Sequence, residues 1–130
     1  YSHNINNIPL NPTLNNTYEV LTKFFGDMAP LFPDRYMHTG GDEVVFGCFT
    51  NNPQVSAWMK QMGFTRPQQL LPYFEDKMHK IFTDVGKTQM FWQDVFDSGY
   101  VPPNGSIVQV WSNPDDLQGV CLPLPPTLTQ

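Results

Sequence analysis

Arg35-Tyr36-Met37-His38-Thr39-Gly40-Gly41-Asp42-Glu43 is a β-prone run that ends in two glycines and two adjacent acids. Neighbouring side chains on a strand point to opposite faces, so Asp42 and Glu43 can serve one site only where the strand ends and the backbone turns. Gly40 and Gly41 permit that turn, because glycine adopts positive φ and lets a ligand approach the main chain closely. Taken alone, the stretch is typical of a surface turn rich in glycine and acids, and the alternative is an acid–base site at a strand end, which the surrounding residues favour.

The flanking residues predict an alternation of helices and strands. Apolar side chains recur at helical spacing in three segments, 18–29, 55–62 and 71–85. β-Branched and aromatic residues predict three strands, 35–39, 88–95 and 106–111. The connection 96–105 is too short for a full crossover helix, which takes about a dozen residues or more. This order of strand, helices and strand predicts an α/β fold with a parallel sheet.

Several motifs occur together in a fixed order. They are Leu10-Asn11-Pro12, the run from Phe32 to Val44, Gly63-Phe64, the run from Phe91 to Asp97, and the run from Ile107 to Trp111. This set resembles the β-N-acetylhexosaminidases of glycoside hydrolase family 20, most closely the lysosomal α/β type, and covers most of residues 8 to 112. The resemblance implies a TIM barrel. A complete (β/α)₈ barrel needs about 250 residues, so 130 residues predict a partial barrel of central strands and helices.

The expected domain organisation follows from the extent of that resemblance. Residues 1–118 are expected to form the partial catalytic barrel. Residues 119–130, which include Leu122-Pro123-Leu124-Pro125-Pro126, have no helical periodicity and do not look like the family, so they are predicted to be a divergent, disordered tail.

The resemblance also implies roles for named residues. Glu43 would be the general acid and base, and Asp42 would orient the substrate's acetamido group. Trp92 and Trp111 would wall the sugar pocket; without the resemblance both would be read as core residues. His38, Gly40 and Gly41 would support the site, although a lone strand histidine is more often a satisfied structural group. No metal and no organic cofactor is implied.

Composition limits the partners. Twelve acids against seven bases give a net charge of −5, and no basic cluster interrupts the chain, which argues against a nucleic-acid partner. No apolar stretch approaches the roughly 18 residues of a membrane span, and residues 1–4 do not look like a signal peptide. The resemblance implies glycans or glycolipids that end in N-acetylhexosamine as substrates, a lysosomal or secreted location, and a parent protein that could be dimeric.

Two cysteines and two sequons are candidate sites for a disulfide bond and for N-glycosylation. Cys48 and Cys121 could pair, but two cysteines do not establish a disulfide framework. In the resembled enzymes the cysteine that matches Cys48 bonds to one just before the position of Tyr1, and that partner is absent here. Asn15 and Asn104 begin glycosylation acceptor patterns. The first pattern has a rival explanation, a helix cap formed by Asn15, Asn16 or Thr17.

The resemblance also sets a limit on activity. In the family, an arginine on an early strand and a tyrosine and an acid on late strands complete the pocket, and those segments are absent here. Oriented binding can be worth roughly 7–11 kcal/mol in favourable cases, so the isolated chain is expected to be weakly active or inactive. Two alternatives stay open: a non-catalytic carbohydrate-binding or interaction fragment, and a truncated chain without a stable fold.

Overall fold

The computed structural model describes residues 7–112, which form a three-stranded parallel sheet covered by helices on one side. The strands are β1 (Tyr36–His38), β2 (Thr88–Trp92) and β3 (Ile107–Gln109), in the order β1-β2-β3. In the register of the sheet, His38 pairs with Met90, and Trp92 pairs with Gln109. Parallel strands bring their carboxyl ends to the same edge, so the residues that follow β1, β2 and β3 meet there.

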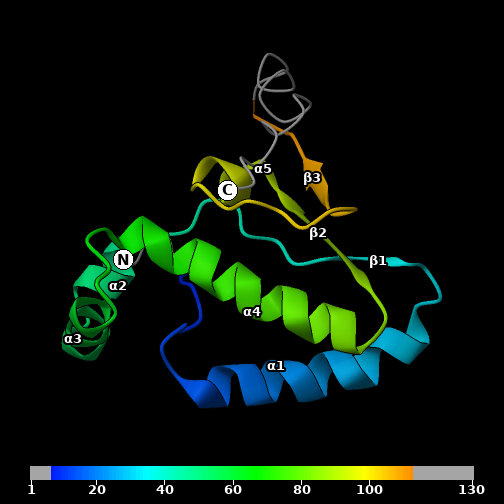
Figure 1. Ribbon diagram of the computed structural model, residues 1–130, viewed down its shortest axis with the longest axis horizontal. Coiled ribbons are helices and arrows are strands. Elements are labelled where there is room, and N and C mark those ends of the chain that lie inside the picture. The colour runs from blue at the N-terminus through cyan, green and yellow to red at the C-terminus, as the bar shows by residue number, and fades with distance from the viewer. Residues whose placement is uncertain (1–6, 113–130) are drawn as a thin grey trace, which may run out of the picture.

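Two long helices form the layers beneath the sheet. They are α1 (Asn15–Met28) and α4 (Leu70–Asp84), and α4 lies between α1 and the strands (Figure 1). The short helices α2 (Gly47–Thr50) and α3 (Pro53–Gln61) lie beyond the N-terminal end of α4. Single 3₁₀ turns, η2 (Ala29–Leu31) and η3 (Pro67–Gln69), follow α1 and precede α4. Parallel strands covered by helices confirm the predicted α/β class, and the arrangement matches a segment of a barrel wall.

Apolar side chains of α4 hold these layers together. Met78, Ile81 and Phe82 face α1, where the Phe25 ring lies 4.7 Å from that of Phe82. Leu71 instead packs against the sheet side with Phe91, Val95 and Tyr100, all of them buried. A further buried group, Phe49, Val55, Met59 and Leu70, joins α2 and α3 to the start of α4. Burial of a large apolar side chain contributes about 1.5–3 kcal/mol, so α4 is the main organiser of the fold.

Two local expectations were wrong. The predicted strand 88–95 ends at Trp92, and residues 93–97 form the short helix α5 (Gln93–Asp97). The turn into α5 buries Gln93 and Val95, a tertiary contact that outweighs the β propensity of this run. At the start of α1 no side chain of Asn15, Asn16 or Thr17 acts as the cap, because the helix begins after Leu14. Thr17 Oγ1 instead donates to the Asn11 carbonyl at 2.8 Å.

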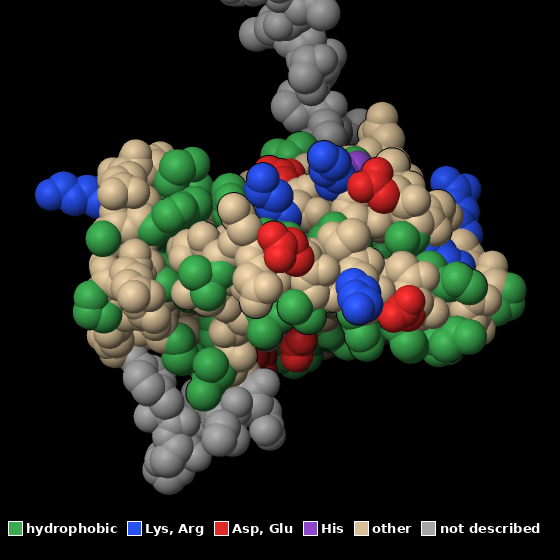
Figure 2. All heavy atoms as spheres, turned by 90° about the horizontal axis from the view of Figure 1, so that it is seen from below, with side chains coloured by type: hydrophobic (Ala, Val, Ile, Leu, Met, Phe, Trp, Pro, Cys, Tyr) green, Lys and Arg blue, Asp and Glu red, His purple; other side chains and the backbone are tan. Residues whose placement is uncertain are grey.

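The outer face of α1 and η2 exposes apolar side chains. Figure 2 views the molecule from this side and shows hydrophobic side chains among acids and bases. Val20, Phe24, Leu31 and Phe32 are all exposed. Within residues 7–112 none of the helices combines the length and the apolar character that crossing a membrane requires.

Candidate active site

The glycine-rich loop after β1 is held against β2 and α5. The Thr39 N–H donates to the Met90 carbonyl at 2.7 Å, and the Trp92 N–H donates to the Gly40 carbonyl at 3.0 Å. Gly40 and Gly41 have φ of 77° and 93°, which side chains disfavour. A methyl group added at Gly41 would overlap Cγ2 of Val95. Glycine is therefore required at position 41 both by the backbone conformation and by the approach of α5.

Four side chains from three separate segments meet just beyond this loop. Asp42 and Glu43 follow β1, Trp92 ends β2, and Trp111 follows β3. Together they line one cavity of about 200 Å³. The two acids are exposed, and Trp111 is 50% exposed, so the cavity opens to solvent. The structure thus brings two carboxylates and two indole rings to one hollow at the carboxyl edge of the sheet.

Glu43 is held by contacts from both sides. Its backbone has φ of 48°, in the left-handed region that non-glycine residues rarely occupy. The Asn7 side-chain amide donates to the Glu43 carbonyl at 3.2 Å and to its carboxylate Oε2 at 3.1 Å. The Glu43 N–H donates to Asp94 Oδ1 at 3.2 Å. These bonds compensate for an unfavourable backbone conformation, as is common at functional sites.

His38 lies on β1 directly below the site. Its Nδ1 accepts from the Gly40 N–H at 2.9 Å, which places the ring proton on Nε2. Its ring lies 4.7 Å from the Trp92 ring, and Nε2 is buried without a hydrogen-bond partner among residues 7–112. His38 therefore supports both the glycine turn and one wall of the cavity.

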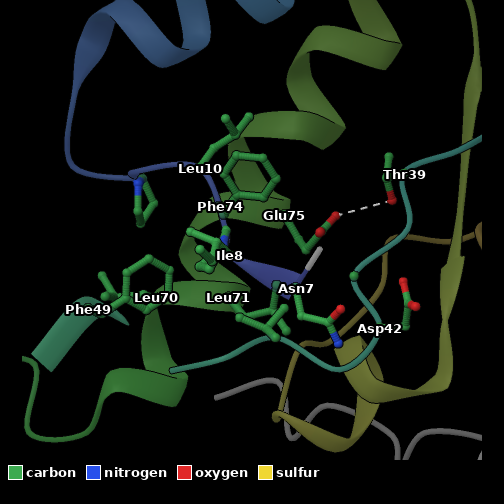
Figure 3. Close-up of a pocket in the computed structure, with 14 residues that line it drawn as sticks. Asn7, Ile8, Leu10, Thr39, Asp42, Phe49, Leu70, Leu71, Phe74 and Glu75 are labelled. Carbon is green, nitrogen blue, oxygen red and sulfur yellow. Dashed lines mark hydrogen bonds between the residues drawn. The ribbon is translucent and has the colours of Figure 1, made fainter. Parts of the chain in front are cut away.

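A second cavity of about 240 Å³ lies behind Asp42 and reaches α4 (Figure 3). Its walls are largely apolar, with Ile8, Leu10, Phe49, Leu70, Leu71 and Phe74 among them. Glu75 projects into it from α4 and is only 1% exposed. Thr39 Oγ1 donates to Glu75 Oε2 at 3.5 Å, and the Gln89 side-chain amide donates to the same oxygen. Burial raises the pKa of Glu75 to about 8, against lowering by these two hydrogen bonds.

Three residues that contact the site or its support were not predicted from the sequence. Asn7 and Asp94 reach Glu43 across separations of 36 and 51 residues, which no local pattern records. Glu75 did leave a signal, because it stands four residues after Leu71 on the apolar stripe of α4. An acid on the buried face of an amphipathic helix is a candidate for a perturbed group.

The remaining candidate positions lie away from the cavity formed by Asp42, Glu43, Trp92 and Trp111. Cys48 is half-buried in α2 with a free thiol, while Cys121 lies outside the described residues, as does the predicted tail 119–130. Asn15 and Asn104 are exposed, the first at the start of α1 and the second in a turn before β3. Within 7–112 no three His, Cys, Asp or Glu side chains are grouped so that they could hold a metal ion.

Comparison with known proteins covers nearly the whole chain. A sequence model of the family described as glycosyl hydrolase family 20, catalytic domain, matches residues 1–121. Beta-hexosaminidase subunit A1 of Dictyostelium discoideum is 39% identical over 120 residues, which are 92% of this chain and 22% of that protein. Beta-hexosaminidase subunit beta of Homo sapiens is 40% identical over 116 residues, or 86% and 21%. The chain thus spans about a fifth of the length of the curated relatives it matches.

Solved structures agree with these sequence matches. The GH20 exo-β-N-acetylglucosaminidase of Vibrio harveyi in complex with N-acetylglucosamine superposes with a TM-score of 0.76 at 27% identity, covering 85% of this chain and 17% of that one. The chitobiase of Flavobacterium johnsoniae gives 0.72 at 28% identity, covering 82% and 16%. The strands and helices described above therefore have counterparts in the same arrangement in larger enzymes.

Proposed function

Because this chain belongs to glycosyl hydrolase family 20, we propose that it carries the acid–base part of a β-N-acetylhexosaminidase. Such an enzyme removes terminal non-reducing N-acetylglucosamine or N-acetylgalactosamine from glycoconjugates. The observation that carries the proposal is the cavity of about 200 Å³ lined together by Asp42, Glu43, Trp92 and Trp111. Two carboxylates supply proton transfer and charge stabilisation, and indole faces suit the apolar C–H surface of a pyranose.

Glu43 acts first as the general acid. The acetamido oxygen of the substrate attacks C1, the glycosidic C1–O bond breaks, and the Glu43 carboxyl gives its proton to the departing oxygen. The product of this step is a positively charged oxazolinium ion formed within the sugar itself. The substrate therefore replaces the protein nucleophile that most retaining glycosidases use.

Glu43 then acts as the base. It takes a proton from water, the water oxygen bonds to C1, and the bond between C1 and the acetamido oxygen breaks, which restores the acetamide with retained configuration. Asp42 accepts the acetamido N–H and its negative charge stabilises the oxazolinium ion. Trp92 and Trp111 enclose the acetamido methyl and the ring. Asn7, bonded to Glu43 Oε2, orients the carboxylate.

The open cavity limits what this chain does by itself. Trp111 is half exposed, and the four lining residues leave much of a sugar ring in contact with water. Orientation and exclusion of water supply much of the barrier reduction in enzymes, so we expect turnover by the isolated chain to be weak or absent. The alternative, a fragment that binds carbohydrate without hydrolysis, is favoured by the same exposed indole ring.

Hydrolysis of a chromogenic β-N-acetylglucosaminide at mildly acidic pH tests the proposal. The assay compares the chain with a chimaera in which residues 7–112 replace the matching segment of the Dictyostelium subunit. Glu43→Gln removes the proton donor while keeping the shape, and Glu19→Gln on the exposed face of α1 is the matched control. We expect turnover by the chimaera that Glu43→Gln abolishes and Glu19→Gln leaves unchanged. A folded chimaera that binds N-acetylglucosamine without turnover would establish the binding-fragment alternative instead.

We infer a lysosomal or secreted location for the parent protein. The resemblance to the lysosomal α/β type of this family motivates this inference. Immunolocalisation of the tagged full-length protein tests it, and a cytosolic distribution would contradict it.

A further inference from the structure

Asp94 in α5 contacts two of the residues that line the cavity of about 200 Å³. Its Oδ1 accepts from the Glu43 N–H at 3.2 Å, and its Oδ2 accepts from the Trp111 indole Nε1–H at 2.8 Å. We propose that Asp94 is a positioning residue that fixes the backbone of the general acid and the indole wall relative to each other. This inference rests on the proposed function for the role of the cavity, although the contacts themselves do not depend on it.

Neither the backbone conformation of Glu43 nor the position of the Trp111 ring is fixed by its own local structure alone. Glu43 has a left-handed backbone, which is unfavourable for a residue with a side chain. Trp111 is 50% exposed, so apolar burial alone holds its ring weakly. Bonds to an ionised acceptor are stronger than neutral ones, and one carboxylate here accepts both donors. The side chain of Asp94 therefore supplies what local conformation and packing do not.

The α5 helix places Asp94 for this task. Trp92 ends β2, the next residue enters the helix, and Val95 is buried against Gly41 on the other side of the same turn. Gln93 adds a further bond, since its Oε1 accepts from Ser112 Oγ at 3.1 Å just after Trp111. The turn into α5, which ended the predicted strand early, thus orients Asp94 towards the cavity and away from the core.

Asp97 provides a matched comparison within the same helix. It is exposed, and its Oδ2 accepts from the Gln93 side-chain amide at 3.1 Å. No hydrogen bond joins Asp97 to Glu43 or to Trp111 among those found within residues 7–112. Asp97→Asn therefore removes the same charge from the same helix without breaking the link between the acid and the indole wall.

Nuclear magnetic resonance of the 130-residue chain tests the link without requiring turnover. The three tryptophans give three indole N–H signals, and Trp111→Phe assigns the one of interest. In Asp94→Asn the new amide nitrogen cannot accept, so we expect the Trp111 indole signal or the Glu43 amide signal to shift and exchange faster with water. Asp97→Asn should leave both signals unchanged, and Asp94→Glu should restore the indole bond. Unchanged signals in Asp94→Asn would overturn the proposal.

Binding of N-acetylglucosamine, followed by tryptophan fluorescence, shows whether the link matters for the site. Loss of one charge-assisted hydrogen bond corresponds to about a tenfold change in an equilibrium, so Asp94→Asn should bind about tenfold more weakly than Asp97→Asn. Equal affinities, with shifted signals, would refute the positioning role. If the wild-type chain binds no sugar, the proposed function loses support, and the resonance comparison alone decides whether Asp94 joins Glu43 to Trp111.

Discussion

Glu75 makes the stability of this chain depend on pH in a way that one substitution removes. Its carboxyl is buried between α4 and the loop after β1, and burial raises its pKa from 4.5 to about 8. Between these values the folded state keeps the proton while the unfolded state loses it. Glu75 therefore does not lower the free energy of unfolding below about pH 4.5. The free energy of unfolding falls as the pH rises from there towards 8, and above that pH it falls no further.

The size of the effect follows from the two pKa values. At about 1.36 kcal/mol per pH unit, the interval from 4.5 to about 8 corresponds to about 5 kcal/mol in total. Between pH 5 and pH 7.5 the expected loss is about 3 kcal/mol, because part of the interval lies outside this range. Glu75→Gln keeps the shape without a titrating group, so its stability should lack this component.

One charged neighbour of Glu75 raises its pKa, as burial does, and the two buried tyrosines nearby carry no charge. The charge of Asp76, on the same helix, raises the pKa of Glu75. Burial raises the pKa values of Tyr18 on α1 and Tyr100 after α5 above the ordinary value of tyrosine. Both side chains are therefore neutral between pH 4.5 and 8. Asp42 faces the same cavity from the loop after β1. No described hydrogen bond or ion pair gives Glu75 a cationic partner, which leaves burial as the dominant cause.

Urea unfolding at pH 5.0, 6.0, 7.0 and 7.5, followed by circular dichroism, measures this difference. We expect the wild-type free energy of unfolding to fall by about 3 kcal/mol more than that of Glu75→Gln across the range. Glu19→Gln, an exposed acid on α1, should follow the wild type. Parallel curves for the wild type and Glu75→Gln would show that the buried carboxyl ionises normally and would refute the reasoning.

Backbone and capping predictions use the same unfolding assay at pH 5. Gly41→Ala should destabilise the chain by at least about 2 kcal/mol, because φ is 93° and the added methyl overlaps Val95. Gly26→Ala, inside α1 with open space around it, should stabilise by about 0.5–1 kcal/mol, and the opposite order would contradict the structure. Asn52→Ala should cost about 1 kcal/mol, because Asn52 Oδ1 accepts from two N–H groups at the start of α3; an unchanged midpoint would exclude this cap.

Local sequence determined most of the secondary structure. The helical spacing of apolar residues predicted α1, α3 and α4, and β-branched and aromatic runs predicted the parallel strands. The Gly-Gly-Asp-Glu order predicted a turn after β1, because glycine readily adopts positive φ, as Gly40 and Gly41 do at 77° and 93°. These features depend on neighbours a few residues apart, which the sequence records directly.

Tertiary structure alone decided how the site is held. Asn7 and Asp94 meet Glu43 across 36 and 51 residues, and Trp111 meets Asp94 across 17. Such pairs carry no local pattern, because their meeting depends on how β1, β2 and β3 align in the sheet. The early end of β2 has the same origin, since burial of Val95 against the glycine turn outweighs β propensity. The resemblance of several ordered motifs to a known family thus predicted which groups could do the chemistry, whereas packing decided which groups contact them.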